Sequence, residues 1–324
     1  MSLTIQMQAI GAPEVLVAVD VDVPPPGPCQ VQVRQTAIGV NFIDIYHRIG
    51  LYPLPHLPAV IGVEGAGVVE AVGPEVSGIE VGDRVAYAGL PPGAYAERRN
   101  LPDARVVKIP ERISDRVAGS AMLRGLTAHM LLHKVYSIQP GDFVLVHAAA
   151  GGLGQFLTRW AKRLGATVIA TVGSEAKIGP AEAAGADLVV LHTASDWTDT
   201  VKRASGGLGV HLACDGIGGE MLARTFASVR PFGVVASVGQ AAGPVPAVDV
   251  SQLGPVRCIS LSRPSVIAYA NDATLYRPAA ADLFAVLTDG LPSNIGGEYS
   301  LREAARAHSD LEGGRTTGSL ILLP

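Results

Sequence analysis

The sequence predicts an α/β protein with two domains, one β-rich and barrel-like and the other built on a doubly wound parallel sheet. About the first hundred residues form short alternating runs such as QVQVRQTAI and GAGVVEAVG, separated by turns rich in proline and glycine. From about Ser114 onward, short apolar strands alternate with helical segments, which is typical of a doubly wound sheet. With 324 residues, 48% hydrophobic and 17% charged, the chain is long enough to bury two cores.

The predicted elements follow in order along the second part of the chain. Residues 114–135 are predicted as a helix that ends near Tyr136, because the QPGD turn comes next. Six apolar runs are predicted as the strands of the sheet: 143–148, 167–172, 188–192, 210–215, 233–239 and 258–262. Two more helices are predicted at 272–290 and 301–314, before a last strand at 319–324. Because the sheet already has its six strands, this last strand is expected to return to the first domain.

The charge pattern, the cysteines and the hydropathy limit the partners and the location. The formal net charge is −4 and the Lys and Arg residues are scattered, so no nucleic-acid partner is expected. No Lys or Arg precedes Arg34, so an export signal is not expected, and no apolar stretch reaches the ~18 residues that a membrane helix needs. Cys29, Cys214 and Cys258 are far apart and form no CxxC motif. We therefore expect a cytoplasmic protein that does not bind membranes.

The stretch HAAAGGLGQF, residues 147–156, lies between a predicted strand and a predicted helix. A dinucleotide-binding turn needs small residues at three places, and Ala149, Gly151 and Gly154 occupy them. The helix that follows offers its N-terminal amides and its dipole to a phosphate. The alternative is a turn of small residues that only lets a strand pack closely on a helix. The strand before it and the helix after it favour the dinucleotide site.

The residues after the second strand of the sheet indicate which dinucleotide is bound. A sheet that binds NAD usually places Asp or Glu at this point, where the carboxylate accepts from the ribose 2′-hydroxyl. Here Gly173, Ser174 and, three residues later, Lys177 follow the strand. Gly173 leaves room for a 2′-phosphate, Ser174 can donate a hydrogen bond and Lys177 can supply a charge, so NADPH is predicted over NADH. The alternative is that Lys177 is only a solvated helix residue, as most lysines are.

The chain contains these segments in order: VQVRQTAIGVNFIDIYHRIGLYP, GVEGAGVVEAVG, GDRVAY, GAYAE, LRGLTAHMLL, HAAAGGLG and SRPS. Together they resemble the quinone oxidoreductase, or zeta-crystallin-like, branch of the medium-chain dehydrogenase/reductase superfamily, and the resemblance runs from about residue 9 to the C-terminus. It implies a GroES-like β-barrel catalytic domain and a Rossmann-type domain. On this basis the domains are predicted at 1–124 (GroES-like) and 125–262 (Rossmann-type, NADPH-binding), with a C-terminal segment at 263–324 that returns to the catalytic domain.

The resemblance also predicts that the chain has no zinc site. Zinc alcohol dehydrogenases of this superfamily carry Cys, His and Cys where this chain has, in or near those places, Asn41, Val63 and Leu123. Val and Leu side chains cannot bind a metal ion. His129 and His133 are four residues apart on a predicted helix, but no HExxH motif or carboxylate partner accompanies them. Packing or surface roles are therefore predicted for these two histidines.

The resemblance places the pocket for the nicotinamide ring and the acceptor at the segment that contains Asn41, Asp44, Tyr46 and Tyr52. Either Tyr can donate a hydrogen bond to a quinone oxygen, and aromatic faces suit a flat acceptor. The alternative for each Tyr is a partly buried barrel residue whose hydroxyl is bonded within the domain. The residues predicted to be catalytic are Asn41, Tyr46, Tyr52 and Arg263.

The cofactor-binding residues come from both domains. Arg124 lies where relatives commonly have Lys, and Thr127 lies where a small hydroxyl approaches the cofactor. His192 falls where close relatives often place a Tyr beside the 2′-phosphate, and a His binds phosphate best when protonated. The predicted cofactor-binding residues are Phe42, Asp44, Arg124, Thr127, Ala150, Gly151, Gly152, Leu153, Gly173, Ser174, Lys177, His192, Gly216, Gly239, Gln240 and Ser265.

The resulting hypothesis is a zinc-independent NADPH:quinone oxidoreductase. Hydride transfer without a metal suits quinones and activated double bonds better than an unactivated ketone, so an NADPH-dependent enal or enone reductase is the second possibility. A third, from another class, is an NADPH-binding protein with a crystallin-like or RNA-binding role. The resemblance also implies a homodimer or a homotetramer; we predict a homodimer in which the strand 233–239 or the segment 258–265 extends a sheet across a two-fold axis. The alternative is that this edge is covered within the monomer.

Overall fold

The computed structural model describes all residues from Met1 to Pro324 and confirms the predicted α/β fold. The chain divides into two compact units. Unit 1 consists of Met1–Leu126 and Val266–Pro324, and unit 2 consists of Thr127–Ser265. The chain therefore passes between the units after Leu126 and after Ser265, whereas the sequence-based limits lie after residues 124 and 262.

Unit 1 is built on two sheets. In the smaller, three-stranded sheet, β1 (Ser2–Met7) pairs antiparallel with β2 (Leu16–Val21) and with β4 (Ala59–Val60). The larger sheet has seven strands in the order β15-β16-β3-β5-β6-β8, with β7 paired to β3. The bounds of its strands are β3 Gln30–Val40, β5 Glu64–Val72, β6 Arg84–Ala88, β7 Arg98–Pro102, β8 Val107–Lys108, β15 Ile295–Ser300 and β16 Ser319–Leu323.

The last strand of the chain, β16, lies inside the larger sheet of unit 1. It pairs antiparallel with β3, so that Leu320 lies opposite Val40. Leu320 and Leu322 are completely buried and join the same apolar core as Val33 and Ile38 of β3. This burial explains why a strand more than 270 residues beyond β3 completes its sheet.

The helices of unit 1 begin with α1, which spans Phe42–Arg48 and was not predicted. Its segment is rich in aromatic and β-branched residues, but Asn41 stands at the N-cap and Asp44 at the third helical position, so a hydrogen-bonded first turn forms. The other helices are α2 Asp115–Met130, which continues into unit 2, α7 Val266–Asn271, α8 Ala273–Thr288 and α9 Ala304–Glu312, with short 3₁₀ turns at Pro13–Val15, Asp103–Arg105 and Leu301–Glu303.

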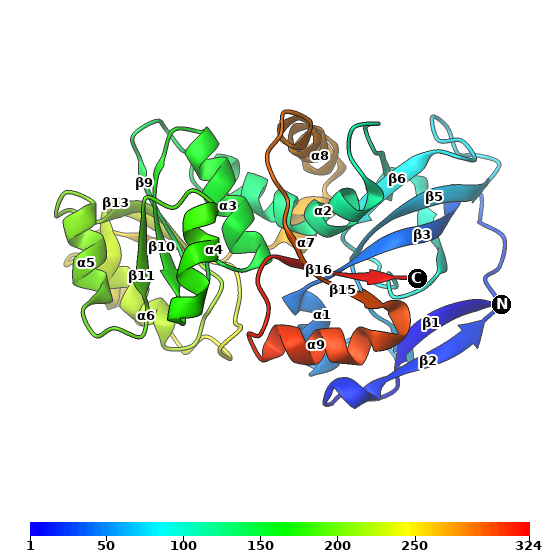
Figure 1. Cartoon of the computed structure of the whole chain (residues 1–324), viewed down its shortest axis with the longest axis horizontal. Coiled ribbons are helices and arrows are strands. Elements are labelled where there is room, and N and C mark those ends of the chain that lie inside the picture. Colours follow the sequence, from blue (N-terminus) through cyan, green and yellow to red (C-terminus); the bar gives the residue numbers. More distant parts are fainter. The chain divides into compact units, whose positions relative to one another are not determined.

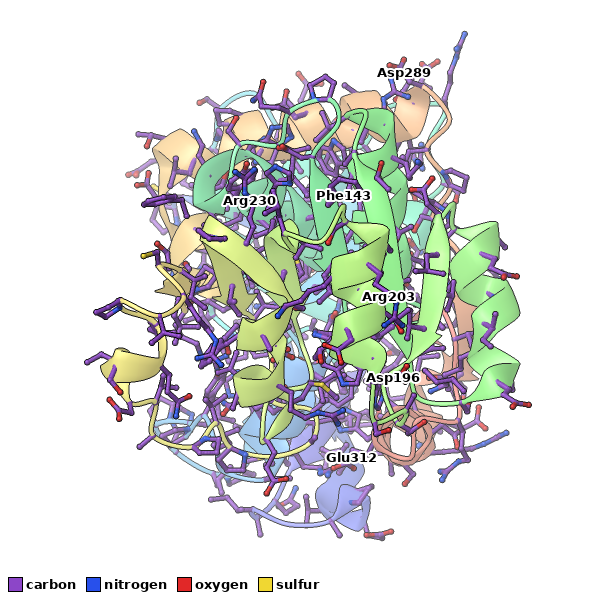
Figure 2. The ribbon with its side chains drawn as sticks, turned by 90° about the vertical axis from the view of Figure 1, so that its left-hand side faces the viewer. Phe143, Asp196, Arg203, Arg230, Asp289 and Glu312 are labelled. Atoms are coloured by element: carbon purple, nitrogen blue, oxygen red, sulfur yellow. The ribbon has the colours of Figure 1, made fainter.

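Unit 2 is a six-stranded parallel sheet in the order β11-β10-β9-β12-β13-β14, which is the strand order of a Rossmann fold (Figure 1). Phe143 and Arg230 lie at the starts of β9 and β13, toward the upper end of the sheet in Figure 2, and Asp196, beyond the end of β11, lies toward the lower end. The carboxyl ends of the strands therefore share one edge. The bounds are β9 Phe143–Val146, β10 Thr167–Val172, β11 Leu188–Leu191, β12 Val210–Asp215, β13 Val229–Ser237 and β14 Ser260–Ser262.

The helices of unit 2 follow the strands in alternation. After the π-helical turn Leu131–Val135 that ends α2, they are α3 Gly152–Arg163, α4 Ile178–Ala183, α5 Trp197–Ala204 and α6 Met221–Thr225, with 3₁₀ turns at Glu175–Lys177, Phe226–Ser228 and Val250–Gln252. In α3, Phe156, Trp160 and Ala161 are buried and face the sheet, and Gly165, with φ of 86°, lies just beyond its end. Among all these helices, none is long and apolar enough to cross a lipid bilayer.

Candidate active site

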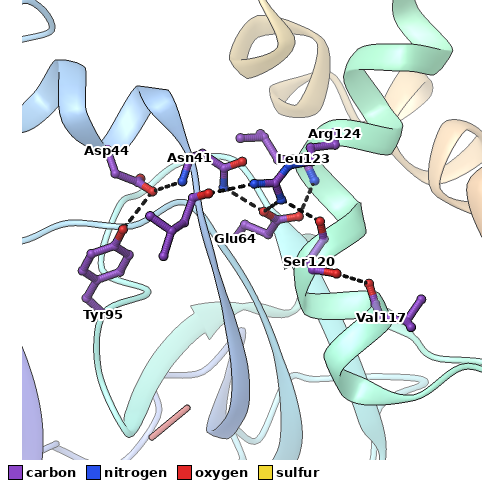
Figure 3. Close-up of polar contacts among 9 residues, drawn as sticks. Asn41, Asp44, Glu64, Tyr95, Val117, Ser120, Leu123 and Arg124 are labelled. Atoms are coloured by element: carbon purple, nitrogen blue, oxygen red, sulfur yellow. Dashed lines mark hydrogen bonds and ion pairs between the residues drawn. The ribbon is translucent and has the colours of Figure 1, made fainter. Parts of the chain in front are cut away.

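The first turn of α1 places one buried polar residue beside another. The Asp44 carboxylate accepts a hydrogen bond from the Asn41 backbone N–H at 2.8 Å, which closes the start of the helix (Figure 3). The Asn41 side chain points the other way and donates from Nδ2 to Glu64 at 2.7 Å. Asn41 is therefore held at both its backbone and its side chain.

Glu64 and Arg124 form a buried ion pair next to Asn41. The Glu64 carboxylate is completely buried, accepts the Leu123 backbone N–H at 2.8 Å and lies 3.6 Å from the Arg124 guanidinium. Arg124 also donates to the carbonyl oxygens of Ser120 at 2.7 Å and Val40 at 2.8 Å (Figure 3). Burial raises the pKa of Glu64, and the Arg124 charge opposes that rise. Arg124, predicted to bind the cofactor, is thus engaged inside unit 1.

One backbone feature, a glycine on β3, leaves room for this ion pair. A Cβ atom at position 39 would lie 2.6 Å from the Cδ of Glu64, so only glycine fits on β3 beside the carboxylate. Val63 is completely buried and Leu123 nearly so. The positions at which zinc relatives carry ligands thus hold an amide bonded to a carboxylate and two apolar side chains, a donor set that does not suit zinc.

Asp44 itself is completely buried. Its Oδ2 accepts from Asn41 and, at 3.1 Å, from the Tyr95 hydroxyl, whereas its Oδ1 has no hydrogen-bond partner. Burial raises the pKa of Asp44 to about 7, although the two donors act in the opposite direction. Asp44, predicted to bind the cofactor, lies in the interior in this structure and contacts the start of α1.

Three aromatic side chains lie together around α1. The rings of Tyr46 and Tyr52 meet edge to face with centroids 5.3 Å apart, and Phe42 is tilted against Tyr46 at 6.2 Å. His47 binds the Tyr52 carbonyl oxygen at 2.9 Å and so holds the loop after α1 close to the helix. Tyr46 is largely buried, and Tyr52 is 37% exposed. The structure therefore brings Phe42, Tyr46 and Tyr52 together as an aromatic group that is accessible at Tyr52.

In unit 2, the glycine-rich turn joins β9 to α3. Ala148 adopts φ of 50°, which ends the strand at Val146, two residues earlier than predicted. A Cβ atom on Gly154 would lie 2.6 Å from the Cα of Ala149, so this glycine permits close contact between α3 and the turn. Ala150 is buried, and the predicted residues Gly151, Gly152 and Leu153 are half-buried at the start of the helix. The N–H groups of Gly152 and Leu153 lie where a helix has no internal acceptors, whereas the Gly151 N–H donates to the Ala148 carbonyl oxygen at 3.0 Å.

His147, which precedes this turn, ties it to two neighbouring elements. Its Nδ1 lies 2.7 Å from the Thr171 hydroxyl and its Nε2 lies 2.9 Å from the Thr225 hydroxyl. The Thr225 hydroxyl donates to the Met221 carbonyl oxygen, so it accepts from Nε2–H, and Thr171 donates to Nδ1. Burial lowers the pKa of His147 to about 3, so the ring is neutral. The sequence analysis did not assign a role to this histidine.

The residues predicted to recognise a 2′-phosphate lie near one another after β10 and β11. Gly173 and Ser174 are exposed and Lys177 is half-buried. A Cβ atom on Gly173 would come within 3.1 Å of the His192 ring, so glycine leaves that side chain accessible. Burial lowers the pKa of His192, and the charges of Arg224 and Lys177 lower it further. His192 is therefore neutral at pH 7 and supplies a hydrogen bond rather than a charge.

Arg224 is a second cation near His192 that sequence reasoning missed. Its guanidinium donates to the Ala194 carbonyl oxygen at 3.3 Å and lies over the Trp197 ring, 5.4 Å from the centroid. It belongs to α6, far along the chain from Lys177, so no local sequence motif predicts its role. The charges of Lys177 and Arg224 both act on His192, so two cations lie near its ring.

The remaining predicted residues lie at the ends of β12, β13 and β14. Gly216 and Gly239 pack against each other, since a Cβ on Gly239 would lie 3.0 Å from the Cα of Gly216. Arg263 donates to the Ser237 carbonyl oxygen at 2.9 Å and hydroxyl at 3.0 Å and approaches the Gly239 carbonyl at 3.4 Å. Arg263, predicted to be catalytic, thus stabilises the end of β13. Gln240 is half-buried and Ser265 exposed at the same edge, and Thr127 is buried in α2.

The two histidines considered as metal ligands pack against an aromatic ring. The rings of His129 and His133 are 4.6 Å apart, and both meet Trp160 of α3 edge-on. No group of three or more His, Cys, Asp or Glu side chains comes together anywhere in the chain in a way that suits a metal ion.

The sequence is similar to family models and to proteins of known function. Two family models match: an alcohol dehydrogenase GroES-like domain over residues 27–111 and a zinc-binding dehydrogenase domain over residues 152–274. A quinone oxidoreductase of Pseudomonas aeruginosa is 41% identical over the full length of both chains. A 2-haloacrylate reductase of a Burkholderia species is 40% identical over 97% of this chain and 96% of its own.

A solved structure is similar throughout. The Escherichia coli quinone oxidoreductase complexed with NADPH superposes with a TM-score of 0.96 at 37% identity, covering 99% of this chain and 100% of its own.

Proposed function

Because the chain belongs to the quinone oxidoreductase branch of the medium-chain dehydrogenase/reductase superfamily, we propose that it transfers reducing equivalents from NADPH to a quinone without a metal ion. One observation carries the choice of cofactor. Gly173 occupies the place after β10 where an NAD-binding sheet usually has an acid; the His192 ring lies beside it, and the charges of Lys177 and Arg224 act on that ring.

The residues present fit NADPH. The N–H groups of Gly152 and Leu153 suit the pyrophosphate, because they are the first amides of α3. Ser174, Lys177 and Arg224 suit the 2′-phosphate, as one hydroxyl donor and two cations. When bound, NADPH supplies the hydride, and its oxidation with a quinone consumes one proton and yields NADP⁺ and a hydroquinone.

The first prediction concerns Lys177. Lys177→Ala is expected to weaken NADPH binding by about 1–3 kcal/mol and to leave NADH binding nearly unchanged, because only NADPH carries the 2′-phosphate. Titration of the nicotinamide fluorescence with each cofactor measures both dissociation constants. Lys202→Ala, on α5 of the same unit, is the matched control and should bind both cofactors normally. Equal losses for the two cofactors would contradict the assignment of Lys177.

On the acceptor side, the aromatic group of Phe42, Tyr46 and Tyr52 suits a flat, apolar ring. Tyr52 is the accessible member and carries a hydroxyl that can donate to a quinone oxygen as negative charge develops there. Asn41 is fixed by Asp44 and Glu64, so this part of the pocket is rigid before any ligand binds. These contacts support a quinone as the acceptor.

A second candidate function is reduction of an activated carbon–carbon double bond, because the similar 2-haloacrylate reductase is named for such a substrate. The test is oxidation of NADPH by the purified protein with a panel of ortho-quinones, para-quinones, enals and haloacrylates. Turnover confined to quinones supports the proposal, and turnover confined to the alkenes would assign the chain to the double-bond reductases. If NADPH binds and nothing on the panel is reduced, a crystallin-like binding role is favoured instead.

We further propose that the protein is a homodimer. β14 is the edge strand of the sheet in unit 2. Two large apolar side chains near this edge are exposed: Val256, before β14, is 86% exposed, and Phe232, within β13, is 85% exposed. Pairing of two β14 strands across a two-fold axis covers both edges. Light scattering after gel filtration is expected to give a mass about twice the 33.4 kDa of one chain. A mass of one chain at micromolar concentration would contradict the dimer.

The three cysteines are free, with Cys29 and Cys258 exposed. Exposed free thiols are typical of a reducing compartment, which supports the cytoplasm as the location.

A further inference from the structure

A buried chain of polar side chains leads from Asp44 to the surface of unit 1. The Tyr95 hydroxyl lies 3.1 Å from Asp44 Oδ2 and 2.9 Å from His308 Nε2. The other ring nitrogen of His308 lies 3.2 Å from Arg48, which forms an ion pair with Glu312 at 2.7 Å. Asp44, Tyr95 and His308 are completely buried, and Arg48 is 2% exposed. Of these residues, only Asp44 was predicted from the sequence to belong to the site.

The direction of each of these hydrogen bonds follows from the arginine at one end of the series, Arg48. An arginine side chain can only donate, so His308 Nδ1 accepts from Arg48. Burial and the Arg48 charge lower the pKa of His308 to about 3, so its ring is neutral and its one proton is on Nε2. Nε2–H therefore donates to the Tyr95 oxygen, and the Tyr95 hydroxyl donates to Asp44. All donors point toward the Asp44 carboxylate.

This series of buried hydrogen bonds ends at the part of α1 that bears the pocket residues. Asp44 Oδ2 receives two donors, the Tyr95 hydroxyl and the Asn41 backbone N–H. The Asn41 side chain donates a hydrogen bond to Glu64, and Tyr46 follows Asp44 by two residues on α1. A carboxylate accepts both bonds more strongly than a carboxylic acid does, and a proton on Oδ1 would have no acceptor.

We propose that Tyr95 and His308 are positioning residues of the reduction: through Asp44 they fix the start of α1, and with it Asn41 and Tyr46, in the arrangement that the acceptor pocket requires. The inference rests on the proposed function, because it concerns the same pocket. It assigns a role to a tyrosine and to a histidine of α9 that are not members of the aromatic group.

The charged and titratable groups around Asp44 come from several elements. Arg48 is on α1 itself, Glu64 is on β5 and Arg124 is on α2, and Tyr95 and His308 complete the set from the segment before β7 and from α9. Glu64 raises the pKa of Asp44, whereas Arg124 and the Tyr95 donor lower it. Loss of the Tyr95 hydroxyl therefore raises the pKa of Asp44.

The test is the pH dependence of kcat/KM for NADPH-dependent quinone reduction. In the wild-type protein, kcat/KM is expected to fall as the pH drops below about 7, where Asp44 takes up a proton. Tyr95→Phe is expected to move this acidic limb about one unit toward higher pH, the change that accompanies loss of one donor to a carboxylate. Tyr299→Phe is the matched control, because Tyr299 donates to Asp310 at 2.9 Å in the same unit, outside the pocket. Its profile should coincide with the wild-type profile.

Two variants of His308 separate positioning from general packing. His308→Gln keeps an N–H toward Tyr95 and an oxygen toward Arg48, so its profile should stay close to the wild-type one. His308→Leu removes both bonds, so the Tyr95 hydroxyl is no longer held toward Asp44, and the limb is expected to shift in the same direction as in Tyr95→Phe. If the wild-type protein reduces quinones and all these profiles coincide, the inference is wrong. If the wild-type protein reduces no quinone, the proposed function fails instead. Should Tyr95→Phe not fold, the two His308 variants decide.

Discussion

Arg124→Met is expected to lower the free energy of unfolding by about 3–5 kcal/mol, the range for breaking a buried ion pair by removing one partner. The substitution leaves Glu64 completely buried without the guanidinium that lies 3.6 Å away, and Asp44 loses the same favourable charge. The carbonyl oxygens of Ser120 and Val40 also lose their donor. Urea unfolding at neutral pH, followed by circular dichroism, measures the loss.

The pH dependence of this loss has a defined sign. Without Arg124, the pKa of Glu64 in the folded protein rises further above its value in the unfolded chain. The folded state then binds a proton more readily than the unfolded state, so the destabilisation is largest above the folded pKa and becomes smaller as the pH falls. Glu64→Gln added to Arg124→Met is expected to recover part of the loss at neutral pH.

A second arginine of the same helix provides the control for Arg124. Arg116 pairs with Glu298 at 2.9 Å, but both side chains are exposed. Arg116→Met is therefore expected to change the free energy of unfolding by about 0–1 kcal/mol. Equal effects of the two substitutions would show that the buried network does not stabilise unit 1 in the way described.

Gly154→Ala is expected to weaken NADPH binding by about 100-fold or more. The new Cβ would lie 2.6 Å from the Cα of Ala149, a backbone atom, so α3 must move away from the turn. The amides of Gly152 and Leu153 move with the helix and no longer converge on the pyrophosphate. Titration of the nicotinamide fluorescence measures the dissociation constant.

The control for Gly154 is another helical glycine of the same unit. A Cβ on Gly179 of α4 would meet no atom within 4 Å, so Gly179→Ala should bind NADPH normally. The near-ultraviolet circular dichroism of Trp160 and Trp197, both in unit 2, shows whether Gly154→Ala is folded. A folded Gly154→Ala protein that binds NADPH like the wild type would contradict the role of the turn.

The parallel sheet was predictable because its strands are short apolar runs separated by helices. β10 and β12 span the residues that their apolar runs predict. β9 is shorter than predicted because Ala148 takes a left-handed conformation, and β13 begins earlier, at Val229. α1 was missed because its aromatic and β-branched residues resemble a strand, whereas the capping interaction between Asn41 and Asp44 starts a helix.

The polar networks were not predictable from local patterns. Tyr95 and His308 are 213 residues apart, and Arg48 and His308 are 260 apart. No spacing rule links such residues, because only the folding of α9 against α1 and the segment before β7 brings them together. Arg224 was missed for the same reason, since α6 brings it close to His192 only in the folded sheet.

The most direct test of the central claim is oxidation of NADPH and, separately, of NADH by the purified protein with a quinone, before and after exhaustive treatment with a metal chelator. The account predicts quinone-dependent oxidation, a kcat/KM for NADPH at least about tenfold above that for NADH, and rates that the chelator leaves unchanged. The chelator result follows from Val63 and Leu123, which cannot bind zinc. A preference for NADH, or activity lost to the chelator and restored by zinc, would contradict the account.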